Sequence, residues 1–361
     1  MSNQNESIIQ SMGLDATLQL PSPVIKRLRK AMLSRLNDIS QDRITLHESV
    51  EGVNTIQELG ADGSVGLNPA ATVMSPKLFV YAALYGSVGV GESYIHGHWA
   101  SDDLVDLIRI FLRNRDDLEG LDTGAARLGH WLGRVMHATR HNSRKGSRRN
   151  ISAHYDLGND FFSLFLDPTL TYSSAIYPSA AATLEQAQKH KLDVICQKLD
   201  LGPDDQVIEI GTGWGGFAIH AAREYGCHVT TTTISREQYE YAVARVAEAG
   251  LQDKVTLLNE DYRDLQGQYD KLVSIEMIEA VGHQYFETYI ETCSKLLKDE
   301  GQALIQAITI ADQRFEQARD TVDYIKRFVF PGGDLPSITV LSDIATRCSD
   351  LRLVQLEDYA D

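Results

Sequence analysis

A glycine-rich turn within residues 207–217 is the part of the sequence whose residue types and spacing point most clearly to chemistry. The run Val207–Ile210 is apolar, and Gly211, Gly213 and Gly216 follow it just before a helical pattern begins. Glycine has no Cβ, so a backbone built from it can approach a ligand closely. The arrangement predicts a strand, a ligand-binding turn and a helix, as in sites for nucleotide-type cofactors.

The glycine spacing by itself leaves two cofactor classes open. It fits the G-x-G-x-x-G fingerprint of dinucleotide sites. With Glu209 as the acid it equally fits the E-x-G-x-G-x-G turn of S-adenosylmethionine-dependent methyltransferases. A dinucleotide site needs an acid about 20 residues further on to hold the ribose hydroxyls. The next expected strand, Cys227–Thr233, ends in threonines without a carboxylate, so the sequence favours S-adenosylmethionine over NAD.

Strand-like and helix-like segments alternate from His154 onward, which predicts an α/β fold: a parallel, Rossmann-like sheet of the class I methyltransferase type with helices on both faces. A helix over Thr183–Leu201 begins with a capping box, S/T-x-x-Q, made by Thr183 and Gln186. The expected strands are Val207–Ile210, Val229–Thr233, Val255–Leu258, Leu272–Ile275, Ala303–Ile308 and, as a sixth, Leu353–Leu356. Ligands bind beyond the carboxyl ends of such strands, where the glycine turn lies.

Length and composition predict four regions. These are a disordered tail over 1–20, a smaller α+β amino-terminal domain over 21–130, a basic linker over 131–150 and a methyltransferase domain over 151–361. Within the smaller domain, residues 101–114 are expected to form a core helix whose apolar positions are Leu104, Val105, Leu107, Ile108 and Leu112.

Charge is unevenly distributed along the chain. The net charge of −16 argues against a general nucleic-acid binder, yet Ser22–Leu36 holds five basic residues and Arg134–Arg149 holds six, with no acid in either. A helix over 22–37 carries Ile25, Leu28, Met32, Leu33 and Leu36 on one face. That face either docks on its own domain or contacts an anionic membrane surface, and the sequence leaves both readings open.

Other sequence features predict a cytoplasmic protein. The polar beginning of the chain lacks a basic n-region, so no signal peptide is expected. The apolar run Leu78–Gly91 is too short and too rich in glycine to span a bilayer. The four cysteines have no metal-ligand spacing, so we expect reduced thiols and no metal site.

Several motifs in one order resemble the cyclopropane fatty acid synthases, including the mycolic acid cyclopropane synthases, over roughly residues 60–361. The motifs are Gly89–Trp99, His154–Phe162, Leu166–Ser173, Glu209–Gly216, Thr233–Gln238, Glu260–Leu265 and Phe330–Ser337. The resemblance implies a methyl transfer from S-adenosylmethionine to a cis double bond of a phospholipid acyl chain. It also implies cofactor contacts by Tyr172, Ser173, Gly211, Gly213, Thr233, Ile234, Gln238 and Tyr262.

Two of these cofactor residues have competing structural roles. In the family the glutamine of T-I-S-R-E-Q serves the ribose, which would explain the missing acid after the second strand. Ser235 and Gln238 also have capping-box spacing, however, and one amide cannot serve both roles fully. Tyr262 could equally be a packing aromatic.

The chemistry requires an alkene to be placed against the methyl donor in a dry slot. Attack leaves a carbocation on the acyl chain, which aromatic faces can stabilise; the candidates are Tyr172, Tyr177, Tyr324 and Phe328. Ring closure then requires a base that removes a proton from the new methyl group. The resemblance implies that this base is a bound bicarbonate.

The bicarbonate set is altered in this chain. The family positions read Ser174, Glu279, Gln306, Ile308 and Phe328, of which only the glutamate and the isoleucine match. Gln306 can donate a hydrogen bond but cannot share a proton as histidine can, and Phe328 has no phenol. Each lost bond to a charged group weakens such a site by about 1–3 kcal/mol. Glu279 is therefore a ligand of a weakened site, the base itself, or a buried carboxylate that organises its loop.

These departures leave the product open. A cyclopropane chain is the first expectation; a methyl-branched or methylene chain, or a catalytically inactive homologue that binds cofactor or lipid, are the alternatives. The resemblance also implies a homodimer and peripheral association with the inner face of the membrane. In this class of sheet an antiparallel seventh strand lies between strands five and six. We expect the complete protein to be longer than 361 residues, or this chain to be unstable alone, because its sequence supplies no seventh strand.

Overall fold

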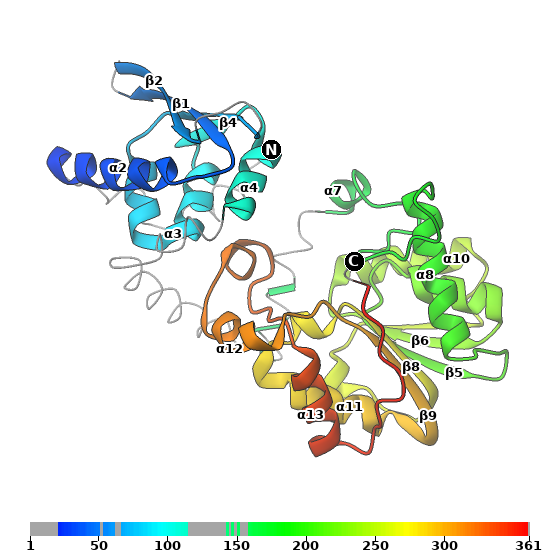
Figure 1. The fold of residues 1–361 in the computed structure, drawn as a ribbon. Helices are drawn as coiled ribbons and strands as arrows, with labels where there is room; N and C mark the ends of the chain where they lie inside the picture. The colour runs from blue at the N-terminus through cyan, green and yellow to red at the C-terminus, as the bar shows by residue number, and fades with distance from the viewer. Residues whose placement is uncertain are drawn as a thin grey trace. The chain divides into compact units, whose positions relative to one another are not determined.

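The computed structural model describes residues 21–50, 53–61, 66–114, 142–143, 146–147, 150–151 and 158–359. The chain forms two compact units, Met1–Val135 and Met136–Asp361 (Figure 1). The division falls inside the predicted basic linker. The basic residues of that linker, the predicted tail and the His154–Leu157 part of the family motif lie outside the described residues.

The smaller unit has a four-stranded sheet covered by helices. The strands β1 (Arg43–Val50), β2 (Val53–Gly60), β3 (Ala70–Val73) and β4 (Trp99–Ser101) lie in the order β2-β1-β3-β4, and only the β1–β3 pair is parallel. The helices are α2 (Ser22–Asn37), α3 (Lys77–Ile95) and α4 (Leu104–Arg113). Both element types are present, as expected for an α+β unit.

Helix α2 docks on its own unit. Leu33 and Leu36 are buried in the core of the smaller unit, and Ile25, Leu28 and Met32 pack against that core. Arg29 of α2 makes an ion pair with Glu48 of β1. The predicted apolar face is thus packed on the smaller unit, which supports the domain-docking interpretation of this segment. Contact of this segment with a membrane stays a prediction.

The sequence predicted a core helix here, but helix α4 buries only some of its apolar residues. Leu107 and Ile110 are buried, whereas Val105, Ile108 and Leu112 are exposed. The apolar positions of this helix surround more of its circumference than one sheet can cover, so one side packs inward and the other does not.

The larger unit contains a five-stranded parallel sheet. The strands β5 (Gln206–Ile210), β6 (His228–Thr232), β7 (Val255–Leu258), β8 (Tyr269–Ile275) and β9 (Leu297–Gln306) lie in the order β7-β6-β5-β8-β9. The order reverses at β5, which places the ligand crevice beyond the carboxyl end of that strand.

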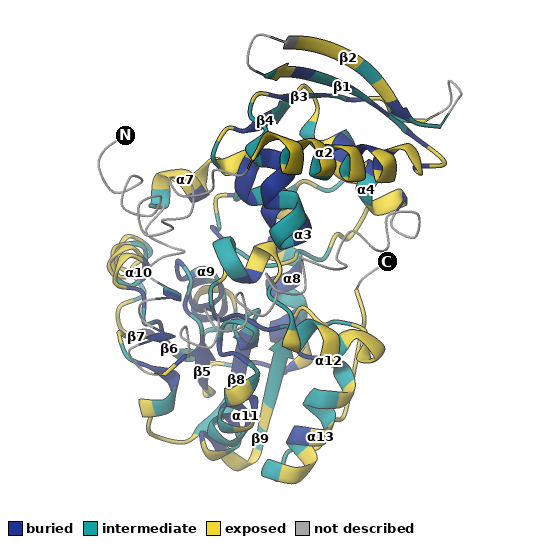
Figure 2. Ribbon diagram, turned by 90° about the vertical axis from the view of Figure 1, so that its left-hand side faces the viewer, coloured by how far each residue is buried: buried dark blue, intermediate teal, exposed yellow. Residues whose placement is uncertain are grey.

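Helices cover both faces of this sheet, as Figures 1 and 2 show. The principal elements are α7 (Asn159–Ser163), α8 (Leu184–Lys198), α9 (Gly216–His220) with a π-helical turn at Ala221–Tyr225, α10 (Arg236–Glu248), α11 (Phe286–Lys295), α12 (Asp312–Asp320) and α13 (Ile338–Cys348). The larger unit also contains short helical turns. Three are 3-10 turns, at Tyr262–Asp264, Ile278–Ala280 and His283–Tyr285, and one is a π-helical turn at Ile325–Val329. The predicted capping box of Thr183 and Gln186 is formed at α8.

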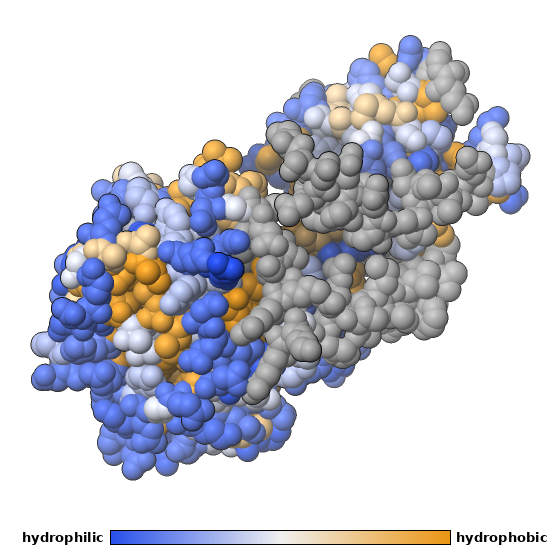
Figure 3. All heavy atoms as spheres, turned by 180° about the vertical axis from the view of Figure 1, so that it is seen from behind, coloured by the Kyte–Doolittle hydropathy of each residue, from blue (hydrophilic) through white to orange (hydrophobic). Residues whose placement is uncertain are grey.

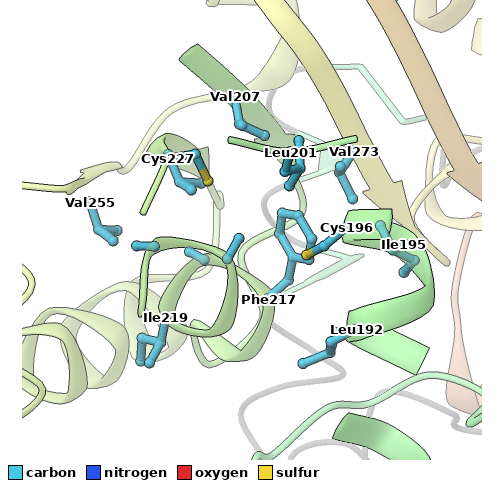
Figure 4. Close-up of a cluster of buried hydrophobic side chains, with 14 of the residues drawn as sticks. Leu192, Ile195, Cys196, Leu201, Val207, Phe217, Ile219, Cys227, Val255 and Val273 are labelled. Atoms are coloured by element: carbon cyan, nitrogen blue, oxygen red, sulfur yellow. The ribbon is translucent and has the colours of Figure 1, made fainter. Parts of the chain in front are cut away.

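Alternate residues of β5 face two separate cores. Val207 belongs to the same buried cluster as Leu192, Cys196 and Phe217 from α8 and α9, which the close-up in Figure 4 shows. Its neighbour Ile208 packs instead with side chains of α11 and α13. Successive strand residues point to opposite faces, so a continuous apolar strand needs a helix layer on each side.

The predicted sixth strand is not formed. Leu353–Leu356 has no regular secondary structure and belongs to neither sheet of the described chain, and Val354 is 92% exposed. In the expected strand order a sixth strand pairs only with a seventh, so without that partner its backbone has no ladder to join. In the part of the chain that the structure describes, no helix has the length and apolar character needed to cross a membrane.

Candidate functional site

A pocket lies at the carboxyl ends of β5, β6 and β8, where the strand order reverses. The eight residues predicted to bind the cofactor all line it: Tyr172, Ser173, Gly211, Gly213, Thr233, Ile234, Gln238 and Tyr262. They come from the segment before α8 and from the turns that follow three different strands. The fold therefore gathers every one of these sequence motifs around one cavity.

The glycine turn is shaped for a close ligand. Gly213 has a φ of +52°, and a Cβ added to it would meet no atom within 4 Å, so it would project into open space at the pocket. Gly211 has a φ of +106°, and a Cβ there would lie 3.2 Å from Met277 Cγ. Both positions require glycine for their backbone conformation, and the first also leaves room that a side chain would fill.

Glu209 is a buried acid at the end of β5 that lines the same pocket. Thr231 Oγ1 donates to its Oε2 at 2.6 Å. Burial raises the pKa of Glu209 to about 8, and the Thr231 bond opposes that rise in part. A carboxyl group with this environment gains by receiving a cation, because a positive partner offsets the cost of burying its charge. The ammonium group of S-adenosylmethionine is such a partner, so the acid and the glycine cradle both fit this cofactor.

Gln238 does not complete a capping box. Ser235 Oγ accepts from the Gln238 backbone N–H at 3.3 Å, but the Ser235 N–H donates to Thr233 Oγ1 at 3.1 Å rather than to the glutamine. The Gln238 Oε1 instead accepts from Thr233 Oγ1 at 2.9 Å. This bond fixes the amide at the pocket wall, which is compatible with the ribose role that the sequence left open.

Tyr262 both lines the pocket and packs in the core. Its ring meets Tyr289 edge-on with centroids 5.6 Å apart, and the Arg263 guanidinium lies 5.4 Å from its centroid. Burial raises the pKa of Tyr262. Tyr262 is therefore a packing aromatic that also reaches the pocket, and its contact with the cofactor stays a prediction.

The five residues predicted for the bicarbonate site behave differently. None of Ser174, Glu279, Gln306, Ile308 and Phe328 belongs to the described lining of the cofactor pocket. Two of them nevertheless meet at one place, because Gln306 Nε2 donates to Ser174 O at 3.2 Å and both contact a further residue, Glu276.

Glu276 is the functional candidate that sequence reasoning missed. Its Oε1 accepts from the Ser174 backbone N–H and from Gln306 Nε2, each at 2.8 Å. It lines the pocket and has a φ of +48°, which is uncommon for a residue other than glycine. The motif E-M-I-E-A-V after β8 holds two glutamates three residues apart, and the family pattern directed attention to the second one. Only the fold shows that the first one meets the two donors.

Glu279 lies close by in a drier environment. Its Oε1 accepts from the Ile308 backbone N–H, while its Oε2 is buried and has no hydrogen-bond partner among the residues that the structure describes. Burial raises the pKa of Glu279 to about 7, and the Ile308 bond opposes that rise in part. In addition the Asp334 N–H donates to the Glu279 carbonyl at 2.9 Å, which ties this turn to the F-P-G-G-D segment. The loop-organising role that the sequence left open therefore has direct support in these contacts.

The aromatic candidates are divided between two places. Tyr172 stacks on Phe330 with centroids 6.4 Å apart and meets Phe162 edge-on at 5.4 Å. Tyr324 and Phe328 pack against each other at 5.0 Å in the segment that precedes Phe330. Tyr177 is 54% exposed. Of these candidates, only Tyr172 lines the cofactor pocket.

Comparison with known proteins identifies the class. Residues 142–360 match the family described as mycolic acid cyclopropane synthetase. The chain belongs to this family. It is an S-adenosylmethionine-dependent methyltransferase with a Rossmann-like class I fold, and S-adenosylmethionine is its cofactor.

Two curated relatives are similar over most of the chain. The tuberculostearic acid methyltransferase UfaA1 of Mycobacterium tuberculosis is 38% identical over 304 residues, which cover 79% of this chain and 70% of that protein. The cyclopropane-fatty-acyl-phospholipid synthase of Escherichia coli K12 is 38% identical over 287 residues, with 78% and 72% covered. The first relative is named as a methyltransferase and the second as a synthase of a modified fatty acyl phospholipid.

Solved structures agree with this assignment. The cyclopropane synthase MmaA2 from Mycobacterium tuberculosis superposes with a TM-score of 0.52 at 30% identity, covering 56% of this chain and 74% of that one. The mycolic acid cyclopropane synthase CmaA1, in complex with S-adenosylhomocysteine (SAH) and CTAB, gives 0.51 at 32% identity and covers 55% and 73%.

Proposed function

We propose that this enzyme transfers a methyl group from S-adenosylmethionine to the double bond of an unsaturated phospholipid acyl chain, and that Glu276 takes the place of bicarbonate as the base. The observation that carries the proposal is the position of the Glu276 carboxylate. It accepts from the Ser174 N–H and from Gln306 Nε2, which are two of the groups that the sequence predicted for a bicarbonate ion.

The reaction needs few groups on the protein. The cofactor, when bound, supplies the electrophilic methyl group. The alkene carbon that bonds to the methyl group leaves its neighbour cationic, and a proton must then depart. Glu276 lines the cofactor pocket, so its carboxylate is placed to accept a proton released there. If the proton leaves the new methyl group and its electron pair bonds to the cationic carbon, a cyclopropane ring results.

A second product is favoured by the altered bicarbonate set. If a hydride shifts along the chain before the proton leaves the methyl group, the electron pair forms a methylene group instead. Gln306 and Phe328 replace groups that would hold a separate base next to the methyl carbon. Removal of the methyl proton is then slower, and the hydride shift can occur first. The similarity to a tuberculostearic acid methyltransferase is compatible with this branch-forming course.

An apolar route to the pocket supports an acyl substrate. Phe161, Leu164 and Phe165, in and just after α7, are 43%, 80% and 48% exposed. Phe165 meets Tyr172 edge-on at 6.2 Å, and Tyr172 lines the pocket. Apolar patches bordered by polar side chains are visible on one face of the larger unit (Figure 3). Exposed apolar side chains that continue into a pocket are suited to a lipid tail. Peripheral contact with the membrane and a homodimer remain predictions.

The test uses the full chain, vesicles of phospholipids with monounsaturated chains, and S-adenosylmethionine whose methyl group carries three deuterium atoms. We expect labelled fatty acyl chains that retain two of the three, because the proton is lost from the methyl group in both courses. Nuclear magnetic resonance then distinguishes the ring from the methylene group, which have the same mass. Unlabelled lipid in the presence of bound cofactor would indicate an inactive homologue and refute the proposal.

A further inference from the structure

Lys191 of α8 is a fully buried lysine behind the cofactor pocket. Its exposed fraction is 0%, and its Nζ donates to Ser173 Oγ at 2.6 Å. Lysine is almost never buried to this extent unless its charge has a partner. Next to it on the same helix, Gln188 Nε2 donates to the carbonyls of Ser173 and Thr171 at 2.8 Å and 3.2 Å. Two polar side chains of α8 therefore hold the irregular segment that carries Tyr172 and Ser173.

The contact fixes the polarity of the Ser173 hydroxyl. An ammonium group has three donors and no acceptor, so the oxygen of Ser173 must accept from Lys191. The hydroxyl proton then has to be donated elsewhere. Ser173 lines the pocket, so a ligand atom there that accepts a hydrogen bond would receive this proton.

The charges around the pocket are asymmetric. Arg263 is the cationic side chain among the described residues that line it, and its guanidinium is held by Asp261 through bonds of 2.7 Å and 2.6 Å. Lys191 has no such bidentate partner; its ammonium contacts a neutral hydroxyl. The carboxylates of Glu276 and Asp167 offset the charge of Lys191 in part, but its ammonium group directly contacts the Ser173 hydroxyl. A negatively charged acceptor atom of a ligand at Ser173 would therefore be stabilised by this ammonium group.

We propose that Lys191 positions the carboxylate of the cofactor's methionine part, acting through the Ser173 hydroxyl. Ser173 donates to the carboxylate, and the ammonium behind it supplies the charge. Glu209, the buried acid at the end of β5, then pairs with the ammonium group of the same methionine part. The proposal concerns cofactor binding alone and does not depend on the acyl substrate.

The titration of Lys191 is consistent with this role. Burial lowers the pKa of Lys191 to about 8, and the nearby carboxylates of Glu276 and Asp167 oppose that shift in part. An anion bound on the other side of Ser173 would stabilise the charged amine and raise its pKa again. The ratio of the affinity for SAH to that for an otherwise identical ligand without the carboxyl group should therefore fall as the pH rises through about 8, because the free protein then loses the ammonium charge. The ratio is the quantity to compare, because Glu209, whose pKa burial also raises to about 8, gains its charge over the same range and acts on the ammonium group of both ligands.

The experiment measures binding by calorimetry, without lipid, for two ligands: SAH, and the analogue of it that lacks the carboxyl group. The variant Lys191→Met keeps the length of the side chain and removes the charge. We expect roughly ten- to hundredfold weaker binding of SAH, as for the loss of a charged hydrogen bond, and less than about threefold change for the analogue. Lys189→Met on the same helix, where Lys189 is exposed and paired with Glu185, is the matched control and should bind both ligands like the wild type.

A second variant keeps the test decisive if Lys191→Met does not fold. Ser173→Ala leaves the ammonium in place and removes the intermediary hydroxyl, and it should show the same selective loss. When both changes can be combined, the double variant should lose little more than either single one, because the two residues act in series. An equal loss for both ligands, or no loss for SAH in Ser173→Ala, would overturn the proposal and assign Lys191 a structural role only.

Discussion

The two ends of the cofactor pocket were specified in different ways. At the cofactor end every predicted residue lines the pocket, because each belongs to a short motif that directly follows a strand or precedes α8. At the catalytic end none of the five predicted residues is among those that line the pocket, and a carboxylate from another position, Glu276, meets the donors of Ser174 and Gln306. The cofactor end depends on backbone shape, whereas the catalytic end depends on which side chain reaches a given pair of donors.

The variant Glu276→Gln should separate the function of the catalytic end from that of the cofactor end most clearly. The amide keeps an oxygen that can accept from both donors but is no base, so we expect turnover to fall by about 10³-fold. Affinity for SAH should stay within about threefold, since calorimetry reports only the cofactor end. Turnover like that of the wild type would show that Glu276 does not accept the proton.

Gly213→Ala tests the cofactor end. The new Cβ would project into open space at the pocket, and we expect SAH to bind about tenfold more weakly. The positive φ also strains alanine by about 1–2 kcal/mol. Gly250→Ala is the matched control, because Gly250 has a φ of +68° and equal space for a Cβ but is not among the pocket-lining residues. Gly250→Ala should lose a similar amount of stability and keep its affinity for SAH. Equal losses of affinity in the two variants would show that the effect comes from a disturbed fold and not from the pocket.

Glu279→Gln tests whether the second glutamate is structural. Burial raises the pKa of Glu279 to about 7, while the unfolded chain has a value near 4.3. The folded state therefore binds the proton more tightly, so the stabilisation is complete below pH ~4 and is lost as the pH rises to about 7. The variant should remove this pH dependence, about 1 kcal/mol after allowance for partial solvent exposure, in urea unfolding at pH 5 and pH 8. If the free energy of unfolding changes by the same amount between pH 5 and pH 8 in the variant and in the wild type, the prediction is wrong.

The smallest effect is expected at Val354. This side chain is 92% exposed in a segment that joins neither sheet, so Val354→Ser should change the free energy of unfolding by less than about 0.5 kcal/mol. Val207→Ser in β5, where the side chain is fully buried, should cost several times more. A comparable loss at both positions would mean that residues 353–356 pair with a strand after all.

Much of the fold could be read from the sequence because its signals are local. The strands β5 to β8 and the helix α8 fall within a few residues of their predicted ranges, since apolar runs, glycines and a capping box mark them. The errors share a cause, which is that apolarity does not say what covers a segment. Val105 and Ile108 of α4 are exposed although they read as core, and Leu353–Leu356 reads as a strand without a partner.

The carboxylate at the catalytic end illustrates the same limit. Glu276 and Glu279 are both visible in E-M-I-E-A-V, and spacing cannot say which one meets the donors. The choice depends on the positive φ of Glu276 and on the approach of Ser174 and Gln306, from segments 102 and 30 residues away in the chain. Lys191 is a similar case, because a lysine within a helix reads as solvent-exposed until the fold buries it.

By itself the sequence determined the class of cofactor, the order of strands and helices and the residues around the glycine turn, because these follow from short motifs and backbone sterics. Only the tertiary structure decided which acid meets the donors of Ser174 and Gln306, which apolar faces are covered and which lysine is buried away from water. Those outcomes depend on contacts between segments far apart in the chain, and the energy of a charge or an apolar face is set by the neighbours that folding brings to it.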